Sequence, residues 1–184
     1  MNLPETIKLA AVCGSVRPKN YTGQVLNFAI DRLQKNSHVQ VSVIDPAEKI
    51  LLFPGHQGHS SADEIQRVVQ ESSGVILATP EYHGTFSSVM KLILENLGDP
   101  SALQGKPVLL IGVTSGNLGA VTAIEHLASV CLHLGAIVFS KFIYISRVGE
   151  FFIEGQCRDA KMEKRIHATF QQFINFIQTI KERT

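Results

Sequence analysis

Cysteine, charge and long apolar runs are all scarce in this sequence of 184 residues. Its three cysteines are far apart and have no CxxC spacing, so we expect reduced thiols and no disulfide framework. Lys and Arg number 17 against 16 Asp and Glu, and they form no basic cluster for nucleic acid. No apolar run approaches the ~20 residues that span a bilayer. We therefore expect a cytoplasmic protein with no nucleic-acid partner and no membrane partner.

Apolar residues, in contrast, are plentiful. They make up 45% of the chain, whereas charged residues make up only 18%, against roughly 25% in an ordinary domain. This composition predicts a large core and excludes a disordered chain. Because domains commonly have about 100–200 residues, we expect one domain over residues 1–184. A domain of this size needs no structural metal for stability.

Short apolar runs alternate with amphipathic segments along the chain, which predicts strands alternating with helices. The predicted strands are residues 7–13, 39–44, 74–79, 107–113 and 136–139, with Pro80 ending the third. The predicted helices are residues 21–36, 61–73, 87–97, 119–134 and 159–180. A capping box of Ser61 and Glu64 opens the second helix. This order predicts an α/β fold with a parallel sheet covered on both faces, whose ligands bind at the carboxyl ends of the strands.

The loop after the first strand, from Gly14 to Thr22, suits a bound phosphate. It leads directly into a helix, whose first N–H groups and dipole attract an anion. Arg17 can add bidentate contacts. The loop matches neither GxGxxG nor GxxxxGK[ST], so it predicts one terminal phosphomonoester. The alternative is that these polar residues only cap the helix.

Two later loops suit a flat ring. TPEYHGTFSS, from Thr79, is stiffened by Pro80 and exposes Tyr82 as a possible wall. The backbone groups of residues 80–84 can pair with the pyrimidine edge of a flavin. The loop at residues 113–119 includes Ser115 and Gly116, whose backbone can approach a ligand and stabilise negative charge. The three loops together can surround one cofactor.

These loops resemble those of the NAD(P)H-dependent FMN reductases, flavodoxin-like proteins that include quinone reductases, chromate reductases and azoreductases. The resemblance rests on GSVRPKNYTG, TPEYHGTFSSVMKLILENLG and GKPVLLIGVTSGNLGA. It implies a flavodoxin-like three-layer sandwich with a five-stranded parallel sheet in the order 2-1-3-4-5. It also implies bound FMN, with NADPH or NADH as hydride donor and ping-pong transfer to free flavin, quinone or a similar small-molecule acceptor.

The resemblance further implies which residues bind FMN. Ser15 and Arg17 are expected at the phosphate, and the backbone of residues 80–83 along the ring. The family commonly has Ser, Asn and Asn where this chain has Asn20, Thr22 and His83. The predicted cofactor-binding residues are Ser15, Arg17, Asn20, Tyr21, Thr22, Pro80, Glu81, Tyr82, His83, Gly84, Ser115 and Gly116. Arg17 and Glu81 are also candidates for contacting the nicotinamide nucleotide, and no side chain is expected to act as a catalytic base.

Two other functions fit the same loops. A flavodoxin-type electron carrier would pass single electrons to proteins, but such carriers usually have a strongly acidic docking surface, whereas the net charge here is +1. The other is a phosphate-binding scaffold without flavin. A metal site is not expected, because no further ligands complete the HxxH spacing of His56 and His59.

The helix predicted at residues 87–97 carries apolar residues over about 200° of its circumference. Such a helix is either buried entirely within one subunit or placed at a contact between subunits. We expect the second arrangement, in a homodimer or homotetramer, because one face cannot cover so wide an apolar arc.

Overall fold

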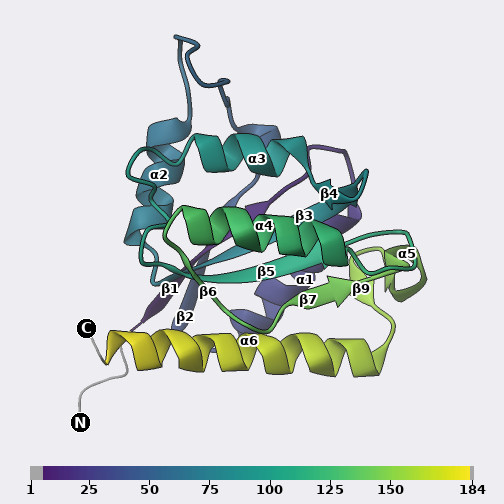
Figure 1. The fold of residues 1–184 in the computed structure, drawn as a ribbon. Helices are drawn as coiled ribbons and strands as arrows, with labels where there is room; N and C mark the ends of the chain where they lie inside the picture. The colour runs from purple at the N-terminus through teal and green to yellow at the C-terminus, as the bar shows by residue number, and fades with distance from the viewer. Residues whose placement is uncertain (1–5, 183–184) are drawn as a thin grey trace.

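The computed structural model describes residues 6–182 as a mostly parallel sheet, with only β4 antiparallel, and helices on both faces (Figure 1). The sheet contains β1 (Ile7–Cys13), β2 (Val39–Ile44), β3 (Gly74–Tyr82), β4 (Thr85–Phe86), β5 (Pro107–Val113), β6 (Ile137–Val138) and β7 (Ile143–Ile145). The helices are α1 (Tyr21–Leu33), α2 (Ala62–Glu71), α3 (Ser88–Glu95), α4 (Val121–His133), α5 (Val148–Phe151) and α6 (Ala160–Lys181), with a 3-10 turn at Pro46–Glu48. A separate hairpin joins β8 (Phe152–Ile153) to β9 (Gln156–Cys157).

The parallel strands lie in the order β2-β1-β3-β5-β6. Because β5 is the fourth parallel strand along the chain and β6 the fifth, this is the predicted order 2-1-3-4-5. Every residue of β5 is buried, as is usual for a strand covered on both faces. The fifth position is shared by β6 and β7, which pair with successive parts of β5, so the single strand predicted at residues 136–139 is too simple.

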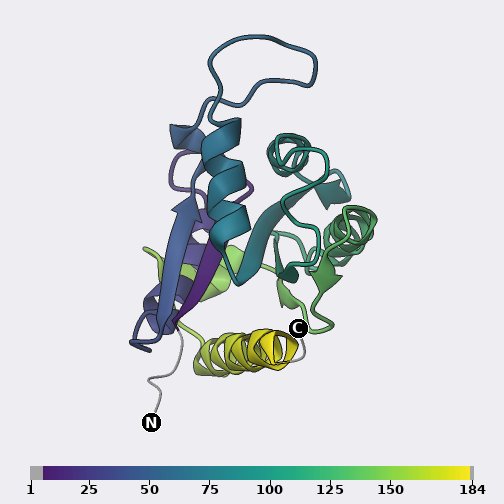
Figure 2. The ribbon, with the colours of Figure 1, turned by 90° about the vertical axis from the view of Figure 1, so that its left-hand side faces the viewer.

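Two apolar cores sandwich the sheet. Side chains of β3 alternate between them: Ile76 and Ala78 belong to the core under α1 and α6, and Val75 and Leu77 to the core under α2, α3 and α4. Figures 1 and 2 show α6, in yellow, on one side of the strands and α3 and α4 on the other. These two cores are the physical basis of the three-layer sandwich.

Helix α6 packs closely on the sheet through an apolar stripe that contains Phe173, Ile177 and Ile180. Phe173 and Ile177 are fully buried, and Ile180, at the end of the stripe, is partly buried. Gly74 permits the close approach, because a Cβ there would lie 2.6 Å from Cδ1 of Ile177. Within residues 6–182, no helix is long and apolar enough to cross a membrane.

The structure corrects two local predictions. Pro80 does not end the third strand, since β3 continues to Tyr82 and pairs there with β4. Because β1 pairs with β3 only as far as Ala78, one edge of β3 needs no further donor beyond that residue and tolerates proline. The capping box is also absent. The hydroxyl of Ser61 accepts from the Ile50 N–H at 3.1 Å and makes no bond to the first turn of α2.

Candidate functional site

A cleft of about 270 Å³ opens where the loops after β1, β3 and β5 meet. These strands are neighbours and parallel, so their carboxyl ends lie at one edge of the sheet. The cleft is lined by Ser15, Arg17, Pro18, Lys19, Asn20, Tyr21, Thr22, Pro80, Glu81, Tyr82, Val113, Thr114, Ser115 and Val148. Nine of the twelve predicted residues are in this lining; His83, Gly84 and Gly116 are not.

Asn20 shapes the first loop and begins α1. Its Oδ1 accepts from the Gly23 N–H at 2.7 Å, and its Nδ2 donates to the Arg17 carbonyl at 2.7 Å. Both ends of the amide are therefore used within the loop. The first turn of α1 contains no acidic residue, and helix geometry leaves its first N–H groups without carbonyl partners. The first backbone N–H groups of α1 and the second N–H of the Asn20 amide are therefore free to donate at this point.

A tight turn aims the second loop. Tyr82 pairs with Thr85 across the intervening His83 and Gly84, whose φ angles are 50° and 74°. Two successive positive φ angles are typical of a type I′ hairpin turn, in which Asn and Gly are favoured. His83 and Gly84 are exposed and lie outside the cleft lining. Their part in the site is to turn the chain so that Tyr82 lies at the cleft.

Ser87 ties the first two loops together. Its Oγ donates to the Gly14 carbonyl at 2.6 Å and accepts from the Met90 N–H at 3.0 Å, and the residue is 1% exposed. Gly14 has no room for a side chain, because a Cβ would lie 2.8 Å from the Ala78 carbonyl oxygen. The loops are thus held at a fixed separation. Sequence analysis missed this role: Ser before a helix indicates a cap, but nothing local indicates a bond to Gly14.

Arg17 and Glu81 are the charged predicted residues of the cleft. The Arg17 guanidinium carbon lies 4.7 Å from the centroid of the Tyr82 ring. Glu81 differs, since its Oε2 is buried and has no hydrogen-bond partner within residues 6–182. This oxygen is covered by the protein itself, so the groups of the cleft that are free to meet a polar ligand are the first N–H groups of α1 and the Arg17 guanidinium.

The third loop is held by the segment that follows β7. The Val148 N–H donates to the Thr114 carbonyl at 3.1 Å, and the Arg147 N–H donates to the Gly116 carbonyl at 3.0 Å. Ser115 lines the cleft, whereas Gly116 lies outside the lining and its carbonyl accepts one of these supporting bonds. Val148 also lines the cleft. No sequence signal could have found Val148, because α5 reaches the site only through tertiary contacts.

Cys13 lies beneath the first loop. Its Sγ is 3.6 Å from the Ser15 carbonyl oxygen, and the residue is 4% exposed. Burial raises the pKa of the Cys13 thiol. The thiol is therefore protonated at neutral pH and fills space below the loop rather than acting as a nucleophile.

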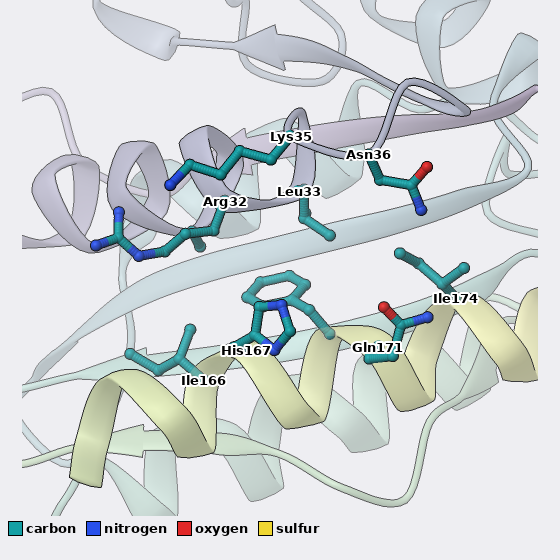
Figure 3. A pocket seen from close by; sticks show the side chains of 10 residues that line it. Arg32, Leu33, Lys35, Asn36, Ile166, His167, Gln171 and Ile174 are labelled. Atoms are coloured by element: carbon teal, nitrogen blue, oxygen red, sulfur yellow. The ribbon is translucent and has the colours of Figure 1, made fainter. Parts of the chain in front are cut away.

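A second hollow, of about 200 Å³, lies between α1 and α6 and contains none of the predicted site residues. Figure 3 shows His167 and Gln171 rising from α6 toward α1, while the side chains of Arg32 and Lys35 extend along the α1 side of the hollow. The charge of Arg32 is already compensated, since its Nη2 lies 2.7 Å from Glu163 Oε1 and its guanidinium lies over the Phe28 ring. This hollow is at the end of α1 opposite the first loop.

Comparison with known proteins decides the family. Residues 7–150 of this chain match the sequence pattern of the NADPH-dependent FMN reductase family. The chain belongs to that family. It is an FMN-dependent reductase that uses NAD(P)H, which confirms the predicted enzyme class and cofactors and favours the reductase over the electron carrier.

Relatives and solved structures agree with this assignment. The reductase is 32% identical over 175 residues to the NADH:(hydroxy)cinnamate reductase subunit CrdA of Vibrio ruber, covering 92% of this chain and 87% of that protein. It is 24% identical to the NADH-dependent flavin reductase subunit 2 of Lactobacillus johnsonii, and the alignment covers 96% of this chain and 98% of that protein. The solved structure of FerB from Paracoccus denitrificans shares the fold, with a TM-score of 0.80 and 20% sequence identity. The superposition covers 95% of this chain and 98% of FerB. The flavodoxin-like class is thus confirmed.

Proposed function

We propose that the cleft binds FMN with its phosphate at the first loop and its ring along the second. The convergence of the two loops in one cleft carries this proposal, because it puts the free N–H groups of α1 and Arg17 beside Tyr82. An anion is stabilised at the first place, and an aromatic ring at the second.

Each part of the chain then has a separate task. FMN held in the cleft would supply the redox chemistry, which is hydride uptake from a nicotinamide and electron transfer to the acceptor. Backbone N–H groups of residues 20–22 hold the phosphate, and Arg17 adds charge. Tyr82 covers the ring, and the backbone of residues 80–82 and 115 borders its polar edge. No side chain takes a proton from the substrate. One open face of the flavin ring receives the hydride donor and then the acceptor, as ping-pong kinetics require.

The acceptor we propose is free flavin, a quinone or a similar small molecule, with NADH or NADPH as donor. Curated relatives support this breadth, because their names include a flavin reductase, a 2-hydroxy-1,4-benzoquinone reductase and an NADPH azoreductase. We further propose that residues 1–184 act as one domain in the cytoplasm.

We also propose a homodimer or homotetramer. Within one subunit Met90, Ile93 and Leu94 of α3 are buried, and Val89 and Leu92 are partly buried, so only part of these last two side chains is left for a contact between subunits. Leu118, which is 84% exposed on the loop before α4, adds to the uncovered apolar surface. Sedimentation equilibrium of the wild-type chain and of Leu92→Glu tests this proposal. A dimer or tetramer that dissociates in the variant supports it, and a wild-type monomer contradicts it.

The reductase is tested by anaerobic titration of the FMN-loaded protein with NADPH and, separately, with NADH. Stoichiometric bleaching of the flavin absorbance, followed by its return on adding an acceptor, supports the proposal. No bleaching with either nucleotide contradicts it. If the protein, mixed with excess FMN and desalted, retains no yellow cofactor and quenches no flavin fluorescence, the site is a phosphate-binding scaffold instead.

A further inference from the structure

Gln24, in the first turn of α1, joins the first loop to a hairpin from a distant part of the chain. Its Nε2 donates to the Lys19 carbonyl at 2.9 Å, and its Oε1 accepts from the Gly155 N–H at 3.1 Å. Both ends of the amide are therefore occupied, and these two bonds orient it in one way only. The side chain is partly buried and outside the lining of the cleft, so it contacts the loop but not a ligand within the cleft.

The hairpin of β8 and β9 is itself anchored on α1. Phe152 is 1% exposed, and its ring lies edge-on to that of Phe28, with the centroids 5.4 Å apart. Glu154 and Gly155 form the turn, with φ angles of 50° and 76°. The Gly155 N–H is thus held at a fixed place beside α1. This hairpin begins after residue 150, where the match to the family pattern ends, so the support of the loop comes from a part of the chain that the pattern does not cover.

The bond to Lys19 fixes the orientation of one peptide group in the first loop. Lys19 has a φ angle of 52°, a left-handed conformation that is strained for a residue with a side chain and persists only where surrounding contacts hold it. In a planar trans peptide the carbonyl of one residue and the N–H of the next point in opposite directions. Because the Lys19 carbonyl points to Gln24, the Asn20 N–H points away from Gln24, and it has no acceptor within residues 6–182. Lys19 and Asn20 both line the cleft, so this free donor belongs to its wall.

We propose that Gln24 is a positioning residue that presents the Asn20 N–H to the phosphate of the cofactor. Without the bond from its Nε2, the peptide between Lys19 and Asn20 is free to rotate toward a less strained conformation, which turns the carbonyl oxygen toward the anion. A carbonyl oxygen repels a phosphate, whereas an N–H binds it. This inference rests on the proposed FMN site and adds to it the side chain that prepares the loop before the cofactor binds.

The test compares Gln24→Met, which removes both hydrogen bonds, with Gln24→Glu, which at neutral pH keeps an acceptor for the Gly155 N–H but has no donor for Lys19. Asn27→Met and Asn27→Glu are the matched controls, because Asn27 is exposed on α1, lies outside the cleft and has no side-chain hydrogen bond within residues 6–182. Dissociation constants for FMN and riboflavin are measured for each protein in about 1 M KCl, where a Debye length of ~3 Å screens the added charge. At low salt, NMR follows hydrogen exchange of the Gly155 amide and the shift of the Asn20 amide resonance on adding inorganic phosphate.

We expect both Gln24 variants to weaken FMN by roughly 10-fold relative to their Asn27 controls, as for the loss of one hydrogen bond to a charged group, and to leave riboflavin within about twofold of wild type. Inorganic phosphate should shift the Asn20 amide resonance in wild type and in the controls, but much less in the Gln24 variants. The Gly155 amide should exchange faster in Gln24→Met only, since Gln24→Glu keeps its acceptor.

A purely structural role of Gln24 gives a different result, in which Gln24→Met weakens FMN and riboflavin together and Gln24→Glu weakens neither. That result overturns the inference, as does an FMN affinity of Gln24→Glu equal to that of Asn27→Glu. If wild type binds riboflavin as tightly as FMN, both the proposed phosphate site and this inference are wrong. If wild type prefers FMN and the Gln24 variants keep that preference in full, this inference alone is wrong.

Discussion

The guanidinium carbon of Arg17 lies 4.7 Å from the centroid of the Tyr82 ring, so a residue that follows β1 contacts one that ends β3. A guanidinium stacked on a tyrosine is held in one place while its edge N–H groups stay free to bind. The contact therefore keeps Arg17 ordered at the cleft before any ligand arrives. In the proposed site the same side chain meets the phosphate, and the ring that holds it covers the flavin.

Replacing Arg17 with Ala is expected to weaken FMN binding by about 1.5–3 kcal/mol, the range for hydrogen bonds to charged groups. Riboflavin has no phosphate, so its affinity should change much less. Quenching of flavin fluorescence gives both constants. Arg17→Lys keeps the charge but loses the planar guanidinium, so its FMN affinity should lie between those of wild type and Arg17→Ala. Equal affinity of wild type for FMN and riboflavin, unchanged in Arg17→Ala, would remove Arg17 from the phosphate.

Ser87→Ala is expected to lower the free energy of unfolding by about 2–3 kcal/mol, because it removes a helix cap and leaves the buried Gly14 carbonyl without its donor. Urea unfolding measures the change. Ser88→Ala is the matched control, since Ser88 is exposed and is the first residue of α3. FMN affinity should also fall in Ser87→Ala, because the first two loops lose their link. Equal stability of the two variants would contradict this role.

His83→Asn is expected to stabilise the protein by roughly 0.5–1 kcal/mol, because Asn adopts the left-handed backbone of the turn with less strain than His. The proposed mechanism gives the imidazole no chemical task, so turnover with NADPH and a quinone should stay within about twofold of wild type. Thermal unfolding and steady-state rates are the measurements. A tenfold fall in kcat with an unchanged unfolding temperature would instead place the His83 ring in the reaction.

Cys131 makes the protein less stable in alkali. Burial raises the pKa of its thiol to about 12, whereas the unfolded thiol titrates near 8.5–9. Between these values the unfolded chain has lost the proton that the folded chain keeps, so stability is complete below pH ~8.5 and falls as pH rises. By pH ~10.5 the loss from this thiol is roughly 2 kcal/mol.

Cys131→Ala should lose that part of the alkaline dependence, as measured by urea unfolding in reductant at several pH values. Cys157→Ala is the control: burial raises the pKa of its thiol too, but the side chain is only partly buried and no comparably large shift is resolved. Identical alkaline slopes in wild type and Cys131→Ala would contradict the assignment. The comparison is between slopes, because Cys131→Ala also leaves a small cavity at every pH.

Local sequence was informative where one physical signal dominates. The strands at residues 7–13, 39–44 and 107–113 have the predicted bounds, because the apolar runs at 7–13 and 107–113 and the apolar–polar alternation at 39–44 are strong local signals. Capping was less reliable. Ser61 has the right neighbours for a capping box, but its hydroxyl is used by Ile50, because a loop packed nearby competes for the same acceptor.

By itself, the sequence determined the fold class, the strand order through family resemblance, and which loops carry polar and aromatic groups. These properties follow from periodicity and from residue types that are close together in the chain. Only tertiary structure decided that Ser87 bonds to Gly14 across 73 positions, that Val148 lines the cleft, and that Oε2 of Glu81 meets no donor within residues 6–182. Each of these depends on which distant groups meet after the sheet has formed, and burial then fixes whether a polar atom finds a partner.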